Sequence, residues 1–162
     1  MGWGQVEAQQ LLLNVALPDR KRWSVSDSTQ WLVATHPDSN SELRVRHWRA
    51  GPQTPRSDCS VQLSRWVPDV PRPTELTTVD RRRIELPATF DTELVVGVEP
   101  DGEGVKGWAL AIGIAPRRCF AALYRTRAEG PSMAEDVADR LGLVVRRVLP
   151  RIELRRIESR IP

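Results

Sequence analysis

The sequence predicts an α+β fold in which helices pack on a single antiparallel β-sheet. Three observations predict it: segments of strand character follow one another through short turns, two segments have helical periodicity, and the composition is globular. The 162 residues are 40% apolar and 28% charged, which suits one domain built on one core. Every apolar run is far shorter than the ~20 residues of a spanning helix, so we expect no membrane span.

The N-terminal part is predicted to begin with a short polar lead over residues 1–10 and a first strand over 11–17. A hairpin follows, with strands over 29–35 and 41–49 joined by a turn rich in Pro, Asp and Asn. Side chains of the second hairpin strand alternate between two faces, with Leu43, Val45 and His47 on one and Arg44, Arg46 and Trp48 on the other.

The first helix is expected over residues 54–66. Cys59, Leu63 and Trp66 lie four and then three residues apart, so they share one helical face. Residues 67–78 contain three prolines, which predicts an extended connector inside the domain.

The C-terminal part is expected to add strands over residues 83–86, 92–99, 105–115 and 118–126, with a hairpin turn at 101–104. One face of the third of these strands carries small residues, namely Gly107, Ala109, Ala111 and Gly113. Small side chains let a neighbouring element approach closely, which predicts a helix packed on this face. The fourth strand is apolar on both faces and is expected to be central.

The second helix is expected to begin at a capping box, Ser132-Met133-Ala134-Glu135, and to present an apolar stripe to the sheet. Pro150 must kink or end this helix. The apolar pattern beyond Pro150 is compatible with either a helix or a strand.

The order of these elements resembles the PsbP/DcrB-like sandwich fold, including bacterial LpqN-type lipoproteins. The resemblance rests on segments 31–34 and 41–45 of the hairpin, 107–110 and 118–124 of the late strands, and the closing helix. It implies an α/β/α sandwich and a small binding, assembly or adaptor module without catalysis, exported in a bacterium. It transfers no functional residue.

Charge and motifs exclude several classes of function. Lys and Arg number 24 against 21 Asp and Glu, and a net charge of +3 does not predict nucleic-acid binding. Phosphate-binding glycine loops and nucleophile elbows are absent from the sequence. We therefore expect no cofactor and no metal, and we expect a protein as the partner.

The two cysteines, Cys59 and Cys119, are candidates for a disulfide. If the first helix covers the fourth late strand, the two could reach the ~4.4–6.8 Å between Cα atoms that a disulfide needs; the alternative is two buried free thiols. A disulfide would indicate export, to the periplasm or the outer membrane, with a lipid anchor possible upstream of Met1. Free thiols would indicate a cytoplasmic adaptor, chaperone or immunity-type protein.

Candidate partner-binding residues are a set of arginines and one tryptophan. Arg140, Arg147, Arg151 and Arg155 would share one helical face if the helix continued past Pro150. The alternative is a solvated face with local ion pairs. Trp48 shares the outward strand face with Arg44 and Arg46 and would anchor a protein contact if exposed. Residues 81–83, three consecutive Arg, indicate a loop or a charged sheet edge.

His36 and His47 carry the remaining hypothesis, a small hydrolase. They are the chain's two histidines and lie on adjacent strands of the hairpin, which makes them candidates for acid–base chemistry near neutral pH. This hypothesis requires both rings to meet in one polar pocket.

Overall fold

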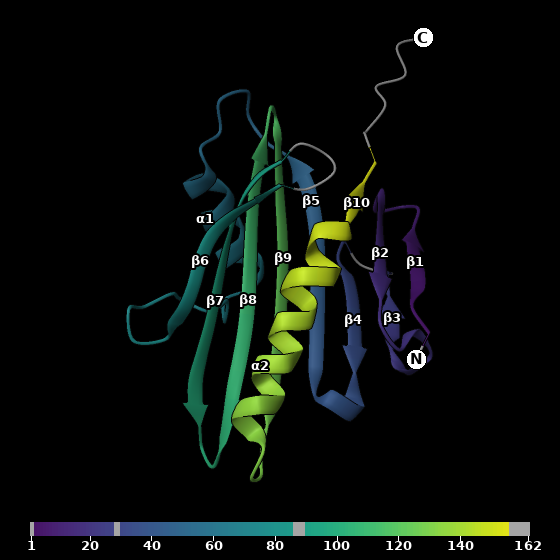
Figure 1. The fold of residues 1–162 in the computed structure, drawn as a ribbon. Coiled ribbons are helices and arrows are strands. Elements are labelled where there is room, and N and C mark those ends of the chain that lie inside the picture. Colours follow the sequence, from purple (N-terminus) through teal and green to yellow (C-terminus); the bar gives the residue numbers. More distant parts are fainter. Residues whose placement is uncertain (1, 28–29, 86–89, 156–162) are drawn as a thin grey trace.

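A seven-stranded antiparallel sheet forms the centre of the protein (Figure 1). The structure, a computed structural model, describes residues 2–27, 30–85 and 90–155. The predicted α+β class is confirmed. From one edge to the other the strands are β3 (Ser24–Ser26), β4 (Leu32–His36), β5 (Ser41–Arg49), β9 (Arg118–Ala128), β8 (Gly104–Ala115), β7 (Asp91–Asp101) and β6 (Thr78–Glu85).

A second, three-stranded sheet was not predicted. Its strands are β1 (Gly4–Ala8), β2 (Leu13–Leu17) and β10 (Glu153–Leu154), with β2 in the middle. The predicted polar lead over residues 1–10 therefore contains a strand: Val6 and Ala8 alternate with polar residues and are buried. The segment after Pro150, for which the sequence left helix and strand open, contains a strand: β10 pairs with β2.

Two helices lie on opposite faces of the large sheet (Figure 1). α1 (Arg56–Trp66) packs on one face. α2 (Met133–Leu143) packs on the other and continues through a π-helical turn (Val144–Val148) and a 3-10 turn (Leu149–Arg151). The small sheet shares the α2 face, so that face has the larger core.

β9 lies between β5 and β8, as its two apolar faces predicted. Its side chains divide between the two cores: Phe120, Ala122 and Tyr124 face α2, and Cys119, Ala121 and Leu123 face α1.

The small-residue face of β8 receives α2, which confirms the predicted close approach. A Cβ atom on Gly107 would lie 2.5 Å from Cγ1 of Val137 and 2.8 Å from Cδ1 of Leu141. The capping box is not formed, because Ser132 makes no side-chain cap hydrogen bond. Its φ of −102° and ψ of 14° differ from the extended conformation that aims an N-cap oxygen at the first turn.

Candidate binding site

Helix α1 covers only the middle of its face of the sheet. Seven strands spaced about 4.8 Å apart span about 29 Å, whereas a helix with its side chains is about 10–12 Å wide. The buried residues Cys59 and Leu63 place α1 against β8 and β9. The strands on either side of it, β5 and β7, therefore keep part of this face uncovered by a helix.

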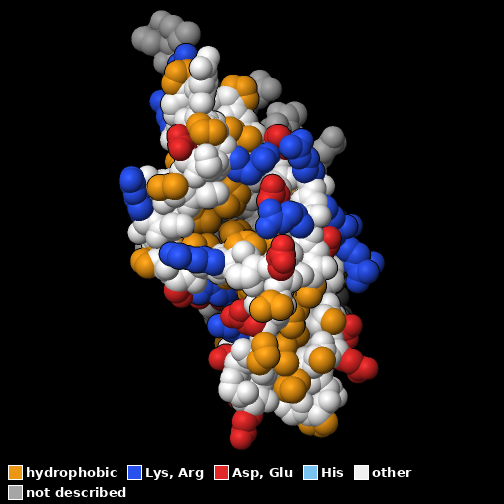
Figure 2. Space-filling model, turned by 90° about the vertical axis from the view of Figure 1, so that its left-hand side faces the viewer, with side chains coloured by type: hydrophobic (Ala, Val, Ile, Leu, Met, Phe, Trp, Pro, Cys, Tyr) orange, Lys and Arg blue, Asp and Glu red, His pale blue; other side chains and the backbone are white. Residues whose placement is uncertain are grey.

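The two flanks of α1 line two different hollows. Toward β6, an apolar groove of about 250 Å³ lies between α1, the connector and strands β6 to β8. Figure 2, which faces this side of the molecule, shows apolar side chains in a depression ringed by basic and acidic ones. Toward β5, an open hollow of about 470 Å³ lies between α1 and the residues that follow the hairpin.

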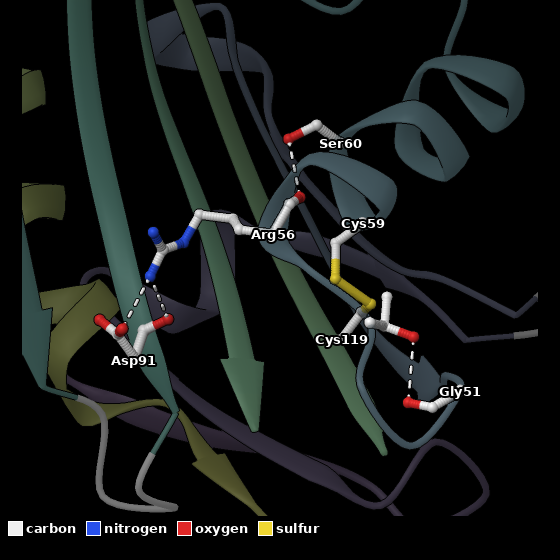
Figure 3. Close-up of a disulfide and its surroundings, with 7 residues drawn as sticks. Gly51, Arg56, Cys59, Ser60, Asp91 and Cys119 are labelled. Atoms are coloured by element: carbon white, nitrogen blue, oxygen red, sulfur yellow. Dashed lines mark hydrogen bonds and ion pairs between the residues drawn. A yellow bond between two sulfur atoms is a disulfide. The ribbon is translucent and has the colours of Figure 1, made fainter. Parts of the chain in front are cut away.

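A disulfide between Cys59 and Cys119 attaches α1 to β9 (Figure 3). The Cα atoms are 5.7 Å apart and both residues are buried, so the predicted pairing is confirmed. A second attachment joins α1 to β7, where the Arg56 guanidinium lies 3.0 Å from the Asp91 carboxylate and donates to the Asp91 carbonyl. These links fix the helix between the two hollows.

The hollow toward β5, which we call the tryptophan hollow, is lined by Arg46, Trp48, Thr54, Asp58, Gln62 and Trp66, among others. Trp48 and Trp66 are half-buried and meet edge to face, with ring centroids 4.9 Å apart. The guanidinium of Arg46 lies 3.4 Å from the Trp66 ring centroid, which is cation–π geometry. Burial lowers the pKa of Arg46, but an Arg side chain stays charged at neutral pH.

Trp48 lies half-buried in this hollow and forms a cluster that the sequence did not reveal. Trp66 shares the predicted helical face of Cys59 and Leu63, but unlike them it is only half-buried. It is the last residue of α1 and meets the rings of Trp31 and Trp48 edge to face. The sequence signal for its partial exposure was that Trp66 is the last residue of the predicted helix.

A third cavity, a cleft of about 640 Å³ lined mainly by polar residues, lies at the end of the sheet that carries the β4–β5 turn and the β7–β8 hairpin. Its three Lys and Arg side chains are each paired with a carboxylate: Arg125 with Asp69 at 2.7 Å, Lys106 with Glu99 at 2.8 Å, and Arg127 with Asp101 at 2.8 Å. These pairs leave little uncompensated positive charge to attract an anionic ligand. In the described residues, no group of three or more His, Cys, Asp and Glu side chains could hold a metal ion.

The predicted arginine stripe does not form one helical face. The helix ends at Arg151, and Arg155 follows β10, where its guanidinium donates to Asn14 at 2.7 Å. Arg151 lies 5.8 Å from the ring centroid of Trp3, and Arg147 is exposed on the helix.

Arg140 is occupied within the protein. It is half-buried, and one of its nitrogens lies within hydrogen-bond distance of three acceptors: the Ser39 carbonyl at 2.9 Å, the Thr126 hydroxyl at 3.2 Å and the Arg127 carbonyl at 3.1 Å. Arg140 therefore joins α2 to the β4–β5 turn, and this geometry assigns it a structural role.

The two histidines do not share a site. His36 is paired with Ser41 across the ladder, and His47 lies six residues further along β5, about 20 Å away at ~3.3 Å per residue. His36 contacts Asp19 and Ser39. His47 donates from Nε2 to the Leu11 carbonyl at 2.7 Å and accepts from Arg118 at Nδ1; burial, reinforced by Arg118, lowers its pKa. The arrangement that the hydrolase hypothesis required is not present.

Comparisons with known proteins show similarity at the level of the fold. No protein-family model matches the chain, and no curated protein sequence matches it. Mog1p, a Ran-binding protein of Saccharomyces cerevisiae, matches with a TM-score of 0.52 and 9% identity over 93% of this chain and 97% of Mog1p. A protein of Bacteroides thetaiotaomicron VPI-5482 matches with a TM-score of 0.51 and 11% identity. The match covers 90% of this chain and 46% of that protein, so this chain spans about half of that protein's length.

In the described part of the chain, no helix is long and apolar enough to cross a membrane.

Proposed function

We propose that this protein is a non-catalytic module that binds a protein partner through the tryptophan hollow. The observation that carries the proposal is the pair Trp48 and Trp66, two large aromatic side chains that stay half-exposed beside a charged Arg46. Trp and Arg are the residue types that contribute most at protein interfaces. Mog1p, which shares the fold, binds Ran, and this supports a binding role for the scaffold.

The tryptophan hollow is held rigidly in place, which favours a role in binding. Trp66 belongs to α1, which the disulfide and the Arg56–Asp91 ion pair hold in place. Trp48 belongs to β5 and is paired with Cys119 of β9, the residue that carries the disulfide. A partner would meet a preformed surface and would lose little affinity to ordering it.

The proposal includes export of the protein, as the PsbP/DcrB-like resemblance implies. A buried disulfide supports an oxidising compartment, since such bonds are rare in the cytosol. The test is the mass of protein from its native source after alkylation without reduction. An unalkylated protein lighter by two hydrogen atoms supports export, whereas two alkylated cysteines support the cytoplasmic adaptor.

Site-specific photo-crosslinking tests the binding surface. We would place p-benzoylphenylalanine at Gln62, which lines the hollow, and at Val61, which is 52% exposed and does not line it, as the matched control. We expect one partner to be crosslinked from position 62 in native cells, and not from position 61. Trp48→Ala should abolish that crosslink. A crosslink that survives Trp48→Ala, or none from position 62, contradicts the proposal.

A further inference from the structure

The outer edge of β6 and the apolar groove beside it form a second surface, separate from the tryptophan hollow. β6 is the last strand of the large sheet and pairs with β7. In the residues that the structure describes, no strand pairs with its other edge. An edge strand presents backbone donors and acceptors that can pair with another chain.

Exposed apolar side chains accompany this edge. Val79 on β6 is 63% exposed, and Leu76 in the preceding turn is 98% exposed. The groove beside them has an apolar floor that includes Leu63, Val95 and Leu110, all buried within the protein. Arg81 belongs both to β6 and to the groove's rim, so a chain paired with β6 would run beside this groove.

The charge of β6 selects what can pair with it. Arg81, Arg82 and Arg83 are consecutive and exposed, so positive charge projects from both faces of the strand. Arg81 and Arg82 contact Glu93 and Asp80, but in the described residues Arg83 has no carboxylate within ion-pair distance.

In the register centred on Arg82, this charge disfavours pairing with a second copy of the same chain. If two β6 strands paired antiparallel about Arg82, Arg82 would face Arg82 and Arg81 would face Arg83. Like charges directly opposite each other destabilise a strand pair, and opposite charges stabilise it.

We propose that β6 binds an extended acidic segment of a partner protein by strand addition. Carboxylates of the segment would face the three arginines, and flanking apolar residues would lie against Val79 and Ile84. Main-chain hydrogen bonds provide affinity in this mode of recognition, and side chains select the sequence.

The probe is the blocked peptide Thr-Val-Glu-Glu-Glu-Thr-Val-Thr. In an antiparallel register its three glutamates face Arg83, Arg82 and Arg81, and its valines face Ile84 and Val79. Its matched control carries three lysines in place of the glutamates. We expect the acidic peptide to bind at least about tenfold more tightly than the basic control peptide. The charge-reversal variant Arg82→Glu/Arg83→Glu should instead prefer the basic peptide. Both arginines are exposed, and circular dichroism would verify that the variant is folded.

Backbone methylation separates strand addition from simple charge attraction. Two further acidic peptides carry N-methyl groups on alternate residues. In one peptide the methylated nitrogens lie on the edge that faces β6, and in the other they lie on the opposite edge. The set that faces β6 should abolish binding, and the set that faces away should be tolerated. In the complex, amide exchange should slow along β6.

Three results with the peptides would overturn the inference. They are no binding of the acidic peptide at about 1 mM, equal binding of the two methylated peptides, and binding that the charge exchange leaves unchanged. Dimerisation of the protein through β6 would also overturn it, because the occupant would then be a second copy.

Discussion

Removal of the Cys59–Cys119 bond should destabilise the protein by about 4 kcal/mol. The bonded residues are 60 positions apart, and the chain-entropy relation for a loop of that length gives about 14 cal/mol/K, or about 4 kcal/mol at 25 °C. Both residues are buried in the core between α1 and the sheet, so an alanine pair would add a packing loss to this figure.

Urea denaturation of three samples separates these contributions: oxidised protein, reduced protein and the Cys59→Ala/Cys119→Ala variant. The reduced protein keeps both sulfur atoms, so it reports mainly the loss of the crosslink. With a slope of about 2 kcal/mol per molar urea, we expect the midpoint of reduced protein to fall by roughly 2 M. The alanine variant should unfold at a still lower concentration. The slope should increase on reduction, because an uncrosslinked unfolded chain exposes more surface.

A loss below about 1 kcal/mol in the reduced protein would refute this reasoning. It would mean that the unfolded chain already holds this loop together, or that strain in the native state offsets the crosslink. An unchanged slope together with the full loss would contradict the part of the argument that concerns the unfolded state.

Three other changes test the packing and the electrostatics. Gly107→Ala places a Cβ atom 2.5 Å from Val137, so calorimetry should show a loss of about 1–3 kcal/mol, partly restored by adding Val137→Ala; full stability of the single variant would contradict the close approach. Because burial lowers the folded pKa of His47 below 6.5, the unfolded chain is protonated first as the pH falls. The free energy of unfolding should therefore decrease from about pH 6.5 down through the folded pKa, and less steeply in His47→Gln; parallel profiles would contradict this. Arg140→Gln removes a charged donor from the part-buried Ser39 and Arg127 carbonyls and should cost about 1–3 kcal/mol by urea denaturation, whereas unchanged stability would contradict the structural role of Arg140.

Strand and helix periodicity predicted most of the large sheet, because these elements are defined by local patterns. β5, β8 and β9 lie close to their predicted bounds. Within the three-stranded sheet, β10 was missed because it has two residues and its pairing with β2 joins residues about 140 positions apart. No local pattern can report such a contact.

The site was predicted less completely than the fold, for a related reason. Cys59 and Cys119 could be paired because each lay on a recognisable face of a regular element. Trp48 was identified as a candidate from alternation alone. Its cluster with Trp66 and Arg46 depends on where α1 crosses the sheet, and the arginine stripe depended on a helix that ends at Arg151. Both are properties of tertiary packing.

Helix α1 buries few residues against the sheet. This leaves part of its face of the sheet uncovered, and it makes the disulfide important for holding the helix in place. Among its eleven residues only Cys59 and Leu63 are buried, and a buried apolar side chain contributes about 1.5–3 kcal/mol. Fixing the backbone of one residue costs about 1–2 kcal/mol, so this burial alone does not hold the helix on the sheet. The C-terminal helical segment is different, since five of its residues from Val137 to Val148 are buried.

Reduction should therefore release α1 before it affects α2. Hydrogen exchange in the reduced, still folded protein should become faster in the amides of α1 and stay unchanged in those of α2. The partner crosslink from position 62 should disappear under the same conditions, because Trp66 leaves the hollow with its helix. Uniformly faster exchange in both helices would show instead that α1 is part of the global folding unit, and that the disulfide stabilises the whole sheet and does not specifically hold the binding surface.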